Sequence, residues 1–129
     1  MPLNRIMIID DDEVDTYTSK RVVSENSFAR EVVTAASVKE AMNYLSGHRS
    51  NLPELIFLDL NMPGLNGLDF LESFGTFTPA EKNSARIILL TNVVNSNNEI
   101  IKKATSHPLV KHVIEKPLTV AKLQSIPGK

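Results

Sequence analysis

Five short apolar runs alternate with segments of helical pattern, and this alternation restricts the possible folds more than any other feature. The runs cover residues 5–9, 31–36, 54–60, 85–91 and 110–116. The first and third are continuously aliphatic, as in strands covered on both faces, whereas the second and fifth carry more polar residues, as sheet edges do. Strands that alternate with helices pair in parallel, and right-handed crossovers place the helices on both faces. The sequence therefore predicts a three-layer α/β sandwich around a five-stranded parallel sheet.

The segments between the runs carry helix start and stop residues. Ser37 and Glu40 form a capping box ahead of an apolar stripe that ends at Gly47, and Ser96 and Glu99 repeat the box before a short helix. A second stripe predicts a helix over residues 67–74, and a short last helix is expected over 118–126. Residues 13–24 predict a helix only weakly, because their β-branched side chains suit extended structure as well. We expect a surface loop over 74–85, and packing positions in or beside the core for the tyrosines and phenylalanines.

Composition excludes several classes of protein. The chain has 129 residues and is 42% apolar, which is enough to close the core of one domain spanning residues 1–129. Its net charge of −1 lacks the basic footprint of a nucleic-acid binder. Cysteine is absent, which excludes disulfides and thiolate metal sites. The N-terminal apolar run is too short for a signal peptide and no run approaches a membrane span, so we expect a soluble, cytoplasmic protein.

Polar side chains stand where the predicted strands end. They are Asp10, Asp11 and Asp12 after the first strand, Asp59 after the third, Thr91 after the fourth and Lys116 after the fifth. Ligands of such sheets bind at the carboxyl ends of the strands, so these residues are expected to gather at one edge. Two carboxylates about 5 Å apart repel by roughly 3 kcal/mol at an effective dielectric constant near 20, so the cluster needs protons or a cation. Oxygen ligands without sulfur favour Mg²⁺, and aspartate can accept a phosphoryl group covalently.

Four motifs at these strand ends, IIDDD, FLDLNMPGLNG, LLT and EKP, together resemble the receiver domains of two-component response regulators, of the single-domain chemotaxis type. The resemblance covers essentially the whole chain. It implies a flavodoxin-like, doubly wound sheet with the strand order 2-1-3-4-5. It also implies that Asp59 is the phosphoacceptor and a metal ligand, that Asp11 ligates Mg²⁺ directly, that Asp10 holds metal-bound water, and that Asn61 lends the metal a backbone carbonyl. Asp12 matches no family role and is expected in a loop or as a helix cap.

The resemblance also identifies the residues that would respond to phosphorylation. Thr91 is similar to the switch hydroxyl that moves toward the phosphoryl group, and Lys116 to the ammonium that contacts it, with a bond to the following proline that is usually cis. Val113 departs from the pattern, because the family usually has Tyr or Phe there, so we expect an output surface that responds less or differently. Asn92 stands where the family tends to have a small residue. Val93 lacks a polar group to orient water, which predicts a long-lived aspartyl phosphate.

These features together predict a stand-alone receiver that is not an enzyme. A sensor histidine kinase or histidine phosphotransfer protein would donate the phosphoryl group, and an unknown downstream protein would read it by direct contact, without nucleic acid or membrane. A degenerate receiver that docks without phosphorylation remains an alternative because of Val113. A Mg²⁺-dependent phosphatase of the haloacid dehalogenase type is less favoured, since Asn61 replaces the general acid. Flavin binding is disfavoured because the acidic loop DDDEVDT would repel the flavin phosphate.

Overall fold

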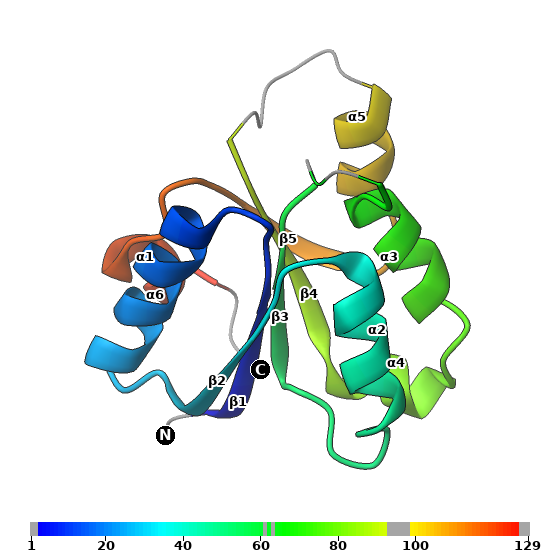
Figure 1. The fold of residues 1–129 in the computed structure, drawn as a ribbon, viewed down its shortest axis with the longest axis horizontal. Coiled ribbons are helices and arrows are strands. Elements are labelled where there is room, and N and C mark those ends of the chain that lie inside the picture. The colour runs from blue at the N-terminus through cyan, green and yellow to red at the C-terminus, as the bar shows by residue number, and fades with distance from the viewer. Residues whose placement is uncertain (1–2, 61, 63, 93–98, 127–129) are drawn as a thin grey trace.

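Five parallel strands form one sheet in the order β2-β1-β3-β4-β5, as the sequence predicted (Figure 1). The computed structural model describes residues 3–60, 62, 64–92 and 99–126. The strands are β1 (Leu3–Ile9), β2 (Ala29–Ala35), β3 (Leu55–Leu58), β4 (Arg86–Thr91) and β5 (Val110–Glu115). The helices are α1 (Glu13–Glu25), α2 (Val38–Ser46), α3 (Gly67–Phe74), α4 (Pro79–Ser84), α5 (Glu99–Thr105) and α6 (Val120–Gln124). The two more polar predicted strands, β2 and β5, lie at the sheet edges.

Two hydrophobic clusters cover the two faces of the sheet. Successive side chains of a strand point to opposite faces, so Ile6 and Ile8 of β1 enter one cluster and Met7 and Ile9 the other. Helices α1 and α6 cover the first face, and α2, α3 and α5 the second (Figure 1). Residues 6–9 of β1, 55–58 of β3 and 87–90 of β4 are buried on both faces of the sheet, which explains the continuous apolar sequence of these central segments.

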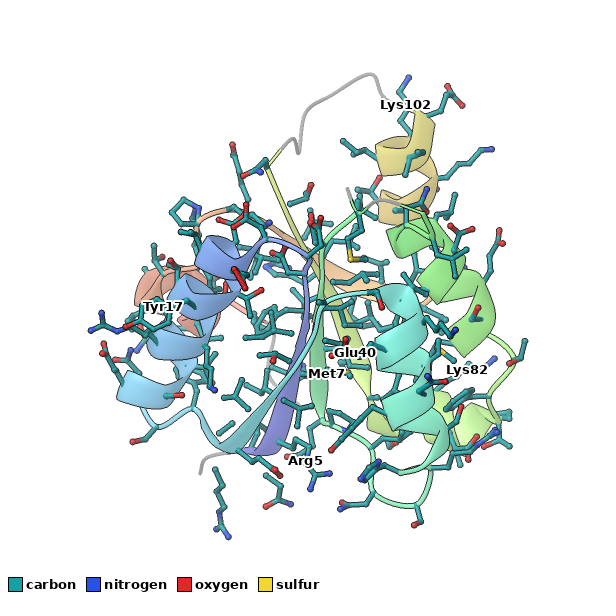
Figure 2. The ribbon with its side chains drawn as sticks, viewed as in Figure 1. Arg5, Met7, Tyr17, Glu40, Lys82 and Lys102 are labelled. Carbon is teal, nitrogen blue, oxygen red and sulfur yellow. The ribbon has the colours of Figure 1, made fainter. Side chains whose placement is uncertain are left out.

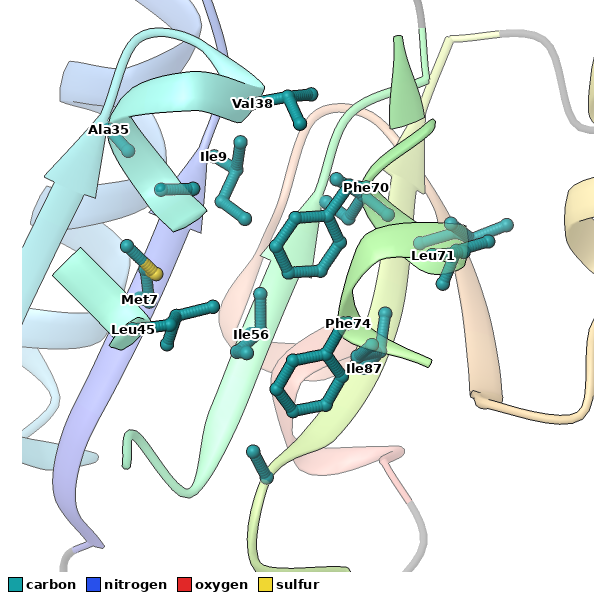
Figure 3. Close-up of a cluster of buried hydrophobic side chains, with 14 of the residues drawn as sticks. Met7, Ile9, Ala35, Val38, Leu45, Ile56, Phe70, Leu71, Phe74 and Ile87 are labelled. Atoms are coloured by element: carbon teal, nitrogen blue, oxygen red, sulfur yellow. The ribbon is translucent and has the colours of Figure 1, made fainter. Parts of the chain in front are cut away.

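Aromatic side chains fill the second cluster beneath α3 (Figure 3). The ring centroids of Phe70 and Phe74 lie 5.8 Å apart, and those of Phe74 and Phe77 lie 4.8 Å apart. Each of these phenylalanines is buried, as the sequence predicted. Their packing fixes α3, whose N-terminus follows the loop from β3, against the sheet.

Residues 74–85 are not the surface loop that we expected, because they include the helix α4. Thr78 caps this helix in a reciprocal box with Glu81, and Pro79 occupies its first turn. Arg49, which follows α2, pairs with the Glu81 carboxylate at 2.7 Å, and its guanidinium lies 4.1 Å from the centroid of the Phe77 ring. The helix has no buried residue and hence no apolar stripe, so hydrophobic periodicity does not detect it. The motif Thr-Pro-Ala-Glu was the available signal.

Residues 13–24, which predicted a helix only weakly, do form one, α1. Asp12 caps it by accepting hydrogen bonds from the backbone N–H groups of Val14 and Asp15, as one of the two roles expected for Asp12 requires. The packing position expected for Tyr17 is wrong, because its side chain is 61% exposed on the outer face of α1 (Figure 2). Tyr44 is half-buried beside the core, as expected. The predicted box at Ser96 lies outside the described residues.

Arginine side chains connect elements at the amino-terminal edge of the sheet. The Arg5 guanidinium of β1 donates a hydrogen bond to Glu31 of β2 at 2.7 Å and another to the carbonyl of Asn51 at 2.9 Å. At the same end of the molecule, Arg49 joins the segment after α2 to α4. The guanidinium groups of Arg5 and Arg49 therefore each have a carboxylate partner.

Gly67 allows α3 to approach the chain that leaves β3. A Cβ atom at this position would lie 2.7 Å from Leu60 Cδ2 and 2.9 Å from the carbonyl oxygen of Asp59. The latter contact is with backbone, which cannot move without shifting the end of β3. Glycine is therefore required here by space, and it sets the position of Asp59 relative to α3.

We expect Gly67→Ala to lower the free energy of unfolding by about 1–3 kcal/mol, the usual cost of overpacking. Urea unfolding followed by circular dichroism measures this. Gly47→Ala is the matched control, since a Cβ at that helix end meets nothing closer than 3.6 Å. Equal effects of the two substitutions would contradict the steric argument.

Candidate functional site

Backbone hydrogen bonds extend the sheet ladders by one residue at the carboxyl ends of the strands. The N–H of Asp10 donates to the carbonyl of Ala35, that of Asp59 to Ile9, and that of Lys116 to Thr91, at 2.8–3.0 Å. These backbone hydrogen bonds fix the main-chain positions of Asp10, Asp59 and Lys116, independently of any contact made by their side chains. The predicted meeting of Asp10, Asp59, Thr91 and Lys116 at one edge is a direct result of parallel pairing.

Three carboxylates lie together at this edge. Asp10, Asp11 and Asp59 each offer an oxygen atom, and these atoms lie within 4.8 Å of one another. Asp10 and Asp59 are only 4% and 5% exposed, whereas Asp11 is exposed. Oxygen donors of this number and charge suit Mg²⁺, which keeps several waters and uses few carboxylates. The exposed side of the cluster leaves room for those waters, so the residues present fit the predicted metal.

The Lys116 ammonium lies among these acids and is almost completely buried, with its side chain 6% exposed. Its Nζ atom is 2.8 Å from Asp10 Oδ2, 2.8 Å from Asp15 Oδ2 and 3.7 Å from Asp59 Oδ2. Burial alone would lower the pKa of Lys116, but hydrogen bonds to Asp10 and Asp15 and the attraction of Asp59 outweigh it and hold that pKa above its ordinary value. The lysine is therefore a cation at neutral pH. Its bond to Pro117 is cis, as expected from the family resemblance.

Thr91 is fully buried at the end of β4, and its Oγ1 has no hydrogen-bond partner among the described residues. Leaving a buried hydroxyl unpaired costs about 1–3 kcal/mol. Such a group needs an explanation, and a hydroxyl at the acidic edge is available to an arriving acceptor such as a phosphoryl oxygen. The switch role of Thr91 stays a prediction.

Asp15 is the site residue that sequence reasoning missed. It lies in the first turn of α1 and contacts Lys116, which is 101 residues away in the chain. An acid in the first turn of a helix is ordinarily explained by the helix dipole, so its identity did not point to the strand ends. Residue spacing held no signal for Asp15, because Asp11 lies outside α1 and spacing does not fix which side of that helix faces Lys116.

Several predicted positions bear on the site in other ways. Asn61 and Val93 lie outside the described residues, so their predicted roles stay predictions. Asn92 is exposed. Val113 packs against the second hydrophobic cluster, and no aromatic ring occupies its place on β5. His112 lies on the opposite face of that strand by alternation.

A family model described as the response regulator receiver domain matches residues 6–126. The chain is also 28% identical over 116 residues to protein-glutamate methylesterase/protein-glutamine glutaminase 1 of Cereibacter sphaeroides, which covers 90% of this chain and 29% of that protein. It is 28% identical over 120 residues to transcriptional regulatory protein MalR of Bacillus subtilis, and that alignment covers 93% of this chain and 47% of MalR. The chain thus spans less than half the length of these relatives.

Solved structures share the fold. A two-component response regulator from Cytophaga hutchinsonii matches with a TM-score of 0.85 at 24% identity, over 98% of this chain and 95% of that one. The CheX-CheY-BeF3-Mg complex from Borrelia burgdorferi matches with a TM-score of 0.74 at 25% identity, over 94% of this chain and 84% of that one. None of the helices in the described part of the chain has the length and apolar character that crossing a bilayer requires. Because the family model covers nearly the whole chain, this protein belongs to the response regulator receiver domain family of two-component signalling.

Proposed function

We propose that this receiver accepts a phosphoryl group on Asp59 from a sensor histidine kinase or a histidine phosphotransfer protein. The observation that carries the proposal is the position of Asp59, a 5% exposed carboxylate at a strand end with two other acids and the Lys116 ammonium beside it. Burying a carboxylate beside other acids destabilises the folded state, and arrangements with this cost are typical of functional sites. The arrangement suits phosphoryl transfer, because that reaction depends mainly on positioning of the reactants and neutralisation of their charge.

The proposed transfer takes place at the Asp59 carboxylate. A carboxylate oxygen of Asp59 forms a bond to phosphorus while the bond from phosphorus to the donor imidazole nitrogen breaks, and the imidazole keeps that electron pair. Asp11 and Asp59, with the backbone carbonyl of Asn61, are the proposed direct ligands of Mg²⁺, and Asp10 would complete the metal site by holding a metal-bound water. When bound, Mg²⁺ neutralises charge on the phosphoryl oxygens.

Two other side chains complete the response. The Lys116 ammonium, already 3.7 Å from Asp59 Oδ2, is positioned to contact a phosphoryl oxygen. The Thr91 hydroxyl, which has no partner among the described residues, donates a hydrogen bond to another. Movement of Thr91 would alter the end of β4. Because Val113 offers no ring to turn inward, the change is carried to a downstream protein by backbone and surface rather than by an aromatic switch.

The two alternatives make different demands on the site. A docking module that needs no phosphorylation has no use for a buried acid cluster with a paired lysine, and this cluster favours the phosphorylated receiver. The phosphatase alternative predicts turnover of a generic phosphomonoester, and an assay that detects such turnover would favour it over the receiver. The methylesterase activity in the name of one relative is not transferred to this chain, which covers 29% of that protein.

We expect incubation with acetyl phosphate or phosphoramidate and Mg²⁺ to add one phosphate, measured by intact mass. Asp59→Asn should abolish the addition, because an amide is not a nucleophile toward phosphorus. Asp12→Asn is the control, since it removes a neighbouring charge and retains an oxygen for capping α1. Phosphate retained by Asp59→Asn would refute the assignment.

We expect Mg²⁺ to raise the free energy of unfolding by about 1.4 kcal/mol at a concentration ten times its Kd, because it binds only the folded acid cluster. Asp11→Asn should lose most of this gain, and Asp12→Asn should keep it. Thermal unfolding with and without MgCl₂, at matched ionic strength, measures the difference. An equal gain in both variants would argue against Asp11 as a ligand.

We expect Thr91→Val to leave the free energy of unfolding unchanged or to raise it by about 1 kcal/mol, because the substitution removes an unpaired buried hydroxyl. The same variant should lose the chemical-shift changes that beryllofluoride and Mg²⁺ produce in β4 of the native protein. Thr91→Ser retains the hydroxyl and should respond. A full response in Thr91→Val, read by NMR, would contradict the switch role.

A further inference from the structure

The Lys116 ammonium is shared unequally among three carboxylates. An ammonium has three N–H donors, and here Asp10 and Asp15 lie at hydrogen-bond distance, 2.8 Å each. The separation of 3.7 Å from Asp59 Oδ2 is an ion pair without that close contact. Two partners on the β1 and α1 side thus hold the cation at a distance from the third.

Backbone hydrogen bonds at the N-terminal cap of α1 hold the main chain of Asp15 in place. Its own N–H donates to Asp12 Oδ1 at 3.0 Å within the cap of α1, and the N–H of Asp12 donates to Asp10 Oδ1 at 3.0 Å. A carboxylate in the first turn of a helix is also stabilised by the helix dipole. The Asp15 side chain is 37% exposed, so water satisfies its remaining acceptor sites while one oxygen faces inward.

The Asp15–Lys116 contact differs from an ordinary surface ion pair. Exposed pairs contribute little because water screens them and their side chains are free to move. The Lys116 side chain is 6% exposed, so each of its donors needs a protein partner, and loss of one partner redirects the cation to the nearest remaining acid. That acid is Asp59, because Asp10 is already in contact.

We propose that Asp15 is a positioning residue that keeps the Lys116 ammonium from closing on Asp59 before the phosphoryl group arrives. The inference rests on the proposed function in one respect, namely that Asp59 must remain available to a metal and a phosphoryl donor. In the absence of Asp15 the ammonium forms a direct contact with Asp59, and the cluster attracts a divalent cation less strongly. Movement from 3.7 to about 2.8 Å at an effective dielectric constant near 20 corresponds to at most about a tenfold change in an equilibrium constant.

The test uses three single variants of the full chain. Asp15→Ala removes the partner, and Asp15→Glu restores a carboxylate at the same position. Glu13→Ala is the matched control, because Glu13 is the other acid in the first turn of α1, is exposed, and forms no ion pair with Lys116 among the described contacts. Both alanine variants remove one negative charge from the same helix turn, so the net charge of the chain changes equally in both.

Two measurements are made on each variant. Metal-free crystal structures give the distance from Lys116 Nζ to Asp59 Oδ2, and calorimetric titration with MgCl₂ gives the Kd. We expect Asp15→Ala to shorten that distance to hydrogen-bond range and to raise the Kd about threefold to tenfold, Glu13→Ala to change the Kd by less than about twofold, and Asp15→Glu to restore most of the native affinity. Equal weakening by both alanine variants, or an unmoved Lys116 in Asp15→Ala, overturns the proposal.

The metal-free structures separate this proposal from the proposed function. A native chain that takes up neither Mg²⁺ nor phosphate refutes the function of Asp59. The position of Lys116 in metal-free Asp15→Ala still decides the role of Asp15, because that position depends on neither ligand. Conversely, if the native chain is phosphorylated and Lys116 does not move in Asp15→Ala, the proposed function is supported and the positioning role of Asp15 is refuted.

Discussion

The attraction between the Lys116 ammonium and the acids at the carboxyl edge of the sheet is the interaction on which the site depends. Asp10 and Asp59 are buried close together and repel each other, and their separation in the structure is tolerable because a cation lies beside both. The same contact ties the end of β5 to the ends of β1 and β3 and to α1. It therefore connects the last strand to the first as well as balancing charge, and the arrangement leaves negative charge in excess, as a metal site requires.

The fold was largely predictable because parallel sheets leave a simple record in sequence. Strands buried on both faces must be aliphatic throughout, and edge strands need not be, so Ile6 to Ile9 contrast with the polar positions of β2. Apolar periodicity detects a helix only by its buried face, so it does not detect α4, which buries no residue. Helix α1 does bury Ser19 and Val23, but its apolar pattern was weak, and Tyr17 lies on its solvent side. Capping residues carried the information in both segments.

The candidate site was predictable to the extent that it is built from strand ends. Asp10, Asp59, Thr91 and Lys116 each follow a strand, so the direction of the chain alone brings them together. Asp15 was not predictable in this way, since its contact with Lys116 depends on the rotation of α1 about its axis and on the rotamer of a long side chain. Neither is recorded in residue spacing. Only the strand-end contacts follow from topology, and helix contributions need coordinates.

The two ends of the sheet differ in how completely their polar groups are matched. At the amino-terminal edge, Arg5 and Arg49 have their carboxylates, and the guanidinium of Arg49 also rests on an aromatic ring. Among the described residues of the opposite edge, acidic groups outnumber the buried Lys116 ammonium, and the Thr91 hydroxyl has no partner. Local opening free energies vary across a protein with the completeness of such contacts. Rearrangement of polar groups at the carboxyl edge would therefore leave the paired contacts of the amino-terminal edge in place, so that one end of the domain would keep its architecture while the other changed.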